Sequence, residues 1–173
     1  MTARVMKSKI AVFIMVAISL LVYTVYTSVN YDPLSQENKQ LIVGDEKVKM
    51  ELIFSKDLIG LSLKGELFDI YIYNTNLQSP PLFTPEILEW QGKKHNENCR
   101  LYGWSKLLKK DKELDSIPLH ALHMADHQLT FEFLQDIKNN SCHFFYIKFH
   151  EMENYLFLYS ETSKKLCYIR NRG

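Results

Sequence analysis

The sequence predicts an α+β fold, in which one antiparallel sheet of about six or seven strands carries two short helices and follows an N-terminal transmembrane helix. Three observations lead to this prediction. Residues 10–31 carry no charged side chain, apolar and polar residues alternate in both halves of the remaining chain, and two short stretches begin with helix-capping residues. Because strand signals dominate both ends of the domain, a β-sandwich is the alternative.

Residues 10–31 are predicted to form a transmembrane signal anchor, with membrane lipid as the partner of this segment. The hydrocarbon core of a bilayer is about 30 Å thick and needs about 20 apolar residues in a helix. A cleaved signal peptide has a shorter apolar region and a small-residue exit, which residues 24–30 do not offer. The sequence leaves cleavage open, whereas a buried core helix is disfavoured by the uniform hydrophobicity.

The charges around this stretch predict its orientation. Three basic residues precede it and no acidic residue does: Arg4, Lys7 and Lys9. By the positive-inside rule, residues 1–9 stay cytoplasmic and the chain is a single-pass protein with its C-terminal part in the periplasm or outside the cell. We expect residues 32–46 to be a polar linker and residues 47–173 to form the exported β-rich domain.

Composition limits what this exported part can bind. Aromatic residues make up 13 % of the 173 residues, which suits one domain with a sizeable core. Removing the three leading basic residues from the total of 21 leaves 18, against 20 acidic residues, so the net charge of the rest is −2. A nearly neutral domain lacks the basic surface that nucleic acid requires, so no nucleic-acid partner is expected.

The order of elements begins with strands. Alternation predicts a strand from Lys47 to Ser55, and two further runs, residues 59–64 and 66–73, form a hairpin with its turn at Gly65. In the third run, three apolar residues share one face: Phe68, Ile70 and Ile72.

Capping residues predict two helices in the middle of the chain. Thr84 and Pro85 open a helix that ends near Gln91, and residues 93–100 form a polar loop. A second helix runs from Ser116 to about Gln128.

The last third of the chain predicts an antiparallel meander of four strands. They comprise residues 129–137, 142–150, 154–160 and 165–170. So many aromatic residues lie in the last three strands that one sheet face and a small helix layer cannot cover them all. We therefore expect a partly exposed aromatic surface able to bind a partner.

Motifs for catalysis are missing. The glycines are too scattered for a dinucleotide-binding, phosphate-binding or serine-hydrolase motif, so we predict no catalytic residue and no cofactor. Residues 150–154 resemble a zinc-protease motif, but Asn154 stands where the second histidine is needed. Cys142 and His143 are adjacent in a predicted strand and point to opposite faces, which excludes a nucleophile–base pair.

One group of residues could bind a metal. His120, His123 and His127 recur at i, i+3 and i+7, within about 60° of one another on a helix. Imidazoles one turn apart can share a zinc or copper ion, although a further ligand would be needed. The simpler interpretation is a polar helix face.

The three cysteines give a further expectation, because thiols tend to pair outside the cytoplasm. In a meander, Cys142 and Cys167 lie on strands separated by a third, at least about 9.6 Å apart, which is too far for a disulfide. Any bridge would then join Cys99 to one of them. The alternative is three reduced, buried thiols.

These features predict a non-catalytic binding domain held on the outer face of a membrane, such as an inhibitor, an immunity-type protein or an envelope accessory protein, with a protein partner. The alternative function is a metal-dependent enzyme or metal-binding protein that uses His120, His123 and His127.

Overall fold

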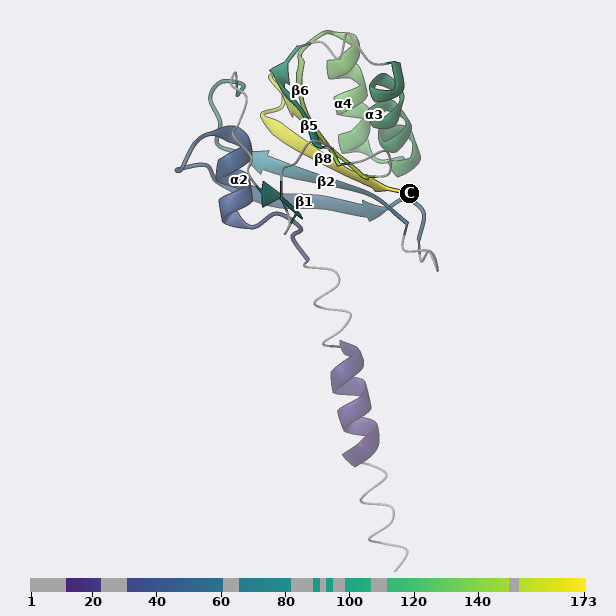
Figure 1. Cartoon of the computed structure of the whole chain (residues 1–173). Helices are drawn as coiled ribbons and strands as arrows, with labels where there is room; N and C mark the ends of the chain where they lie inside the picture. The colour runs from purple at the N-terminus through teal and green to yellow at the C-terminus, as the bar shows by residue number, and fades with distance from the viewer. Residues whose placement is uncertain are drawn as a thin grey trace, which may run out of the picture. The chain divides into compact units, whose positions relative to one another are not determined.

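A computed structural model describes residues 12–22, 31–60, 66–81, 89–90, 93–94, 99–106, 112–149 and 153–173 (Figure 1). These residues form two compact units, one ending at Ser35 and one running from Gln36 to Gly173. The second unit combines a six-stranded antiparallel sheet with helices, which confirms the predicted α+β class. The β-sandwich alternative is wrong, because within the described residues helices rather than a second large sheet cover one face of this sheet.

The C-terminal strand lies inside the sheet. In spatial order the strands are β1 (Met50–Asp57), β2 (Leu67–Thr75), β8 (Lys165–Arg172), β7 (Glu153–Ser160), β6 (Cys142–Phe149) and β5 (Cys99–Ser105). All neighbours are antiparallel. The predicted meander is therefore confirmed for β6, β7 and β8, and β2 pairs with β8 so that Ile72 lies opposite Cys167.

Two helices, α3 (Lys112–Ala125) and α4 (Gln128–Lys138), lie side by side over one face of the sheet (Figure 1). Phe68, Ile70 and Ile72 all point to this face, as the alternation predicted. The buried cluster beneath the helices consists of Phe68, Ile70, Ile72, Ala121, Leu122, Ala125, Phe133, Cys142, Phe144, Tyr146, Leu156, Leu158, Cys167 and Ile169.

The opposite face carries a row of aromatic rings that crosses five strands, which we call the aromatic ladder. Its members are Tyr71, Tyr168, Phe157, Phe145 and Trp104. Successive ring centroids are 5.6, 4.7, 5.7 and 5.6 Å apart. Since directly opposite residues on neighbouring strands lie close together, the strand register places these rings in contact.

This aromatic face is covered, so the expected exposed aromatic surface is wrong. Helix α2 (Gln36–Val43) lies against it, because Lys39 Nζ is 5.2 Å from the ring centroid of Tyr73 and Trp104 Nε1 donates to Ile42 O at 2.8 Å. Trp90, from the hairpin of β3 (Glu89–Trp90) and β4 (Lys93–Lys94), packs edge-on against Tyr155 and Phe157. We had expected only one face of the sheet to be covered, but aromatic rings are buried on both faces.

Residues 129–137 were predicted as a strand, but they form most of α4. The first five residues of this stretch alternate in polarity, which imitates a strand. The burial of Thr130, Phe133 and Asp136 follows the helical period instead. A capping box between His127 and Thr130 begins the helix, and this reciprocal pair satisfies backbone donors that a strand would leave to a neighbour.

Several boundaries also differ. The predicted linker 32–46 contains α2, and the predicted loop 93–100 contains β4 and the start of β5. The predicted helix 84–91 is wrong at Glu89–Trp90, where β3 forms, and residues 84–88 and 91 lie outside the described residues. Residues 59 and 60, predicted to begin a strand, are not in one. Residues 61–65, which include the expected turn at Gly65, lie outside the described residues.

The predicted anchor, residues 10–31, is described only in part. Residues 12–22 are helical, whereas 10, 11 and 23–30 lie outside the described residues. Among the described helices, none is both long and apolar enough to cross a membrane.

Candidate functional site

The structure separates the three histidines that the sequence grouped together. His120 and His123 lie on α3, which ends at Ala125. Asp126 then has a positive φ of 48°, and His127 is extended as the N-cap residue of α4. The shared helix face that the metal hypothesis assumed therefore does not include His127.

Two of the histidines have structural contacts instead. The His120 ring stacks on Phe68, and the His127 ring stacks on Phe54 with the ring centroids 4.4 Å apart. His127 Nδ1 also accepts a hydrogen bond from the Leu129 amide at 3.2 Å. Within the described residues, no group of three or more His, Cys, Asp or Glu is placed to hold a metal ion. Metal binding by these histidines stays a prediction.

The three cysteines are free and buried. Cys142 and Cys167 lie on β6 and β8 with β7 between them, so the prediction that these two do not bridge is confirmed. Burial raises the pKa of the Cys142 thiol to about 12, with the Asp136 and Glu161 carboxylates adding to the shift. Burial also raises the pKa of Cys99 and of Cys167. Because the thiolate is the reactive form, these are structural thiols.

A polar cluster that the sequence did not predict lies where β5, β6 and the β7–β8 turn meet. We call it the His143 corner, and it consists of His143, Glu161 and Lys106. His143 Nε2 bonds to Glu161 Oε1, and Lys106 Nζ lies 3.0 Å from the same oxygen. His143 is only 3 % exposed, whereas the carboxylate and the ammonium group reach solvent.

The electrostatics of this corner favour the charged carboxylate. The hydrogen bonds from His143 and then from Lys106 hold the pKa of Glu161 below its ordinary value. The other imidazole nitrogen, His143 Nδ1, is buried and has no hydrogen-bond partner among the residues that the structure describes. The buried His143 imidazole therefore contacts the solvent-exposed ion pair of Glu161 and Lys106 from the protein side.

A second polar contact ties α4 to the same turn from the helix side of the sheet. Ser160 Oγ donates to Asp136 Oδ2 at 2.5 Å and accepts from the Ser163 amide at 3.0 Å. Ser141 Oγ donates to the carbonyl oxygen of Asp136 at 3.0 Å. The end of α4 is thereby fixed to one end of the β6–β7 pair, where β6 begins and β7 ends.

The His143 corner contains charged groups, but the thiol of Cys142, the residue before His143, does not reach it as a nucleophile. Cys142 belongs to the core beneath the helices, whereas His143 points to the other face, as alternation along a strand requires. One signal in the sequence could have revealed the corner. His143 pairs with Tyr159 across the β6–β7 hairpin, so residue 161, two positions further, is its diagonal neighbour on the same face.

The domain also exposes apolar side chains on its helices. Leu119, Met124 and Phe131 are 39, 36 and 42 % exposed. His120 and His123 lie on the exposed side of α3 together with the first two. Single exposed apolar residues are common, and these three are the exposed large apolar side chains on the helices of the domain whose burial the structure describes.

Comparison with known protein families, curated proteins and solved structures finds no match to this chain.

Proposed function

We propose that this chain is a single-pass membrane protein with a non-catalytic binding domain on the outer side of the membrane. Residues 10–31 anchor it, and the part that begins at residue 47 binds a protein partner, as an inhibitor, an immunity-type protein or an envelope accessory protein does. The exposure of the helix at residues 12–22 is the observation that supports this proposal. Its nine large apolar side chains are between 50 and 75 % exposed.

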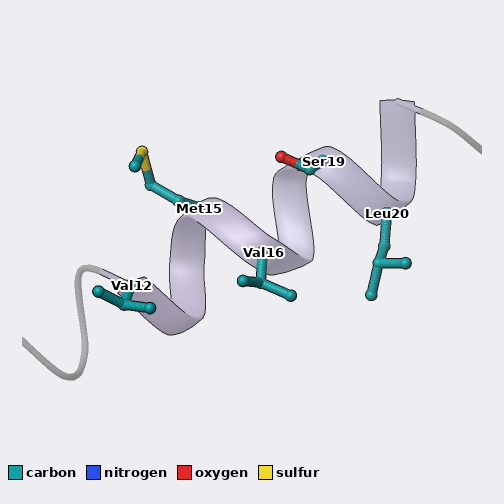
Figure 2. A pocket seen from close by; sticks show the side chains of 5 residues that line it. All are labelled: Val12, Met15, Val16, Ser19 and Leu20. Atoms are coloured by element: carbon teal, nitrogen blue, oxygen red, sulfur yellow. The ribbon is translucent and has the colours of Figure 1, made fainter.

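This exposure extends around the whole circumference of the helix. Successive residues are rotated by about 100°, and Ile14 and Leu21 lie on the side opposite to Val12 and Val16 (Figure 2). A helix that is apolar on every side is suited to a protein core or to lipid. Lipid acyl chains fit it here, because the basic residues that precede it match the cytoplasmic flank of an anchor.

The domain itself favours binding over catalysis. Its thiols are buried, and their raised pKa values keep them protonated at neutral pH. The His127 imidazole caps a helix and the His143 imidazole is engaged by Glu161. By contrast, Leu119, Met124 and Phe131 offer apolar surface beside polar histidines, which resembles the composition of protein interfaces.

Reporter fusions test the anchor and its orientation. Alkaline phosphatase fused after Asn30 is expected to be active, and a reporter that works only in the cytosol is expected to be inactive at the same position. Alkaline carbonate washing should leave the full chain in the membrane fraction. The reverse reporter pattern, or release by carbonate, would contradict the anchor.

Site-specific photo-crosslinking tests the binding surface. A photoreactive residue at Leu119, Met124 or Phe131 of the full chain is expected to capture the same protein partner in each case. Ser55, exposed on the edge strand β1, is the matched control and should capture nothing. Equal capture from all four positions, or from none, would contradict the proposed surface.

A further inference from the structure

Two basic side chains lie directly opposite each other at one end of the sheet. Arg100 on β5 pairs with Lys148 on β6, so both point to the same face. This is the face that the helices cover, because Tyr146, two residues before Lys148, belongs to the buried cluster there. Like charges directly opposite each other destabilise a sheet, and no carboxylate among the described residues forms an ion pair with either cation. Arg100 is exposed and Lys148 is half-buried, so a ligand can reach both.

An amide side chain continues this row on the next strand. Lys148 lies opposite Asn154 on β7, and Asn154 lies opposite Asn171 on β8, at the end of the sheet where the C-terminus is marked in Figure 1. Asn154 is only 8 % exposed, and the Tyr146 hydroxyl donates to its Oδ1 at 2.5 Å. Because this bond uses the amide oxygen, the amide nitrogen of Asn154 remains as a donor beside the two cations.

We propose that Arg100, Lys148 and Asn154, which we call the basic row, bind an oxyanion with two negative charges, such as a phosphate or a dicarboxylate. All three side chains offer N–H donors, and an oxyanion offers acceptors. The Cβ atoms of directly opposite residues are about 5 Å apart, so the guanidinium and the ammonium group can meet on one ligand. A guanidinium binds a carboxylate or a phosphate through two parallel hydrogen bonds. The bound charge also offsets the repulsion within the pair, so binding should stabilise the fold. This site depends neither on the anchor nor on a protein partner.

Titration of the full chain in detergent micelles tests the basic row. The probes are inorganic phosphate and succinate, each added at millimolar concentration against sodium chloride of the same ionic strength. Calorimetry measures binding, and thermal denaturation measures the midpoint of unfolding. We expect at least one probe to bind and to raise the midpoint. A response to phosphate alone would identify a phosphate ligand, and a response to succinate alone would identify a carboxylate ligand. If neither probe binds beyond the chloride control, the proposal is wrong.

Charge-removing variants locate the site. Arg100→Met and Lys148→Met should each weaken binding of the responding probe about tenfold or more, the effect of losing one hydrogen bond to a charged group. Lys49→Met removes an exposed lysine that directly precedes β1, and this matched control should keep the native affinity. Without a probe, Lys148→Met should unfold at a higher temperature than the native chain, because the like-charge pair is gone. Equal losses of affinity for Lys148→Met and Lys49→Met would show that the chain attracts anions only through its overall charge, and would overturn the site.

Discussion

At the scale of single residues, Glu161 is a solvent-accessible carboxylate with two direct polar partners. His143 and Lys106 both donate to its carboxylate. The pKa of Glu161 is therefore lower in the folded chain than in the unfolded chain. The unfolded chain takes up the proton first on acidification. The stability that this carboxylate provides is therefore fully present above its ordinary pKa of 4.5 and decreases as the pH falls through the folded value.

A substitution checks this linkage. Glu161→Gln keeps an oxygen that can accept from His143 but cannot titrate. We expect the free energy of unfolding of the variant to fall less than that of the native chain between pH 7 and pH 3, as measured by urea denaturation. Glu51→Gln, at an exposed position on β1, is the control and should keep the native pH profile. Identical profiles for the native chain and Glu161→Gln would contradict the argument.

At the scale of elements, α4 depends on a cap that uses an imidazole. His127 Nδ1 accepts from the Leu129 amide, and Thr130 Oγ1 lies 3.2 Å from the His127 amide and 2.7 Å from its carbonyl oxygen. His127→Ala should cost about 1 kcal/mol of stability through the lost cap, and more through the lost stacking on Phe54. His127→Asn should recover the cap alone and give an intermediate value.

The measurement is again the free energy of unfolding from urea denaturation. His123→Ala is the matched control, because it removes an exposed histidine that lies in the last turn of α3 and is not the N-cap of α4. A loss for His123→Ala equal to that for His127→Ala would show that the cap contributes nothing.

Sequence reasoning succeeded for elements whose pattern is local. The alternation in β2 and the short polar turns between β6, β7 and β8 predict those strands and their order, because antiparallel neighbours joined by short turns leave few choices. It failed for α4, where a polar–apolar alternation of five residues competed with a helix cap. It also missed the His143 corner, since the two partners are 18 residues apart and meet only through the hairpin register.

At the scale of the whole molecule, the pairing of β2 with β8 joins the first strand pair to the C-terminal meander. Arg170 Nε and Nη2 donate to Asp69 Oδ2 at 3.0 and 2.5 Å across this junction, 101 residues apart in sequence. No local pattern encodes such a pairing, so the sequence could predict both strands without their contact. The burial of the second sheet face also depends on contacts between distant parts of the chain. Helix α2 and Trp90 cover that face, and no local pattern predicts that they pack there.

Removing one partner of this pair should be costly. Asp69→Ala leaves the Arg170 guanidinium, whose side chain is 17 % exposed, without its carboxylate, and we expect a loss of about 3 kcal/mol. Asp69→Ala combined with Arg170→Met should lose less than the sum of the two single losses, since no charge is then left alone. Additive losses in urea denaturation would show that the two side chains do not interact.

The inner position of β8 also determines when the domain can form during synthesis. Until the ribosome has translated as far as Arg172, β2 and β7 have no strand between them, and the other five strands can form only two separate pieces, β1–β2 and β5–β6–β7. Nascent chains arrested before Lys165 should therefore be digested readily by protease, whereas chains released after Arg172 should resist it. Resistance before Lys165 would contradict this order.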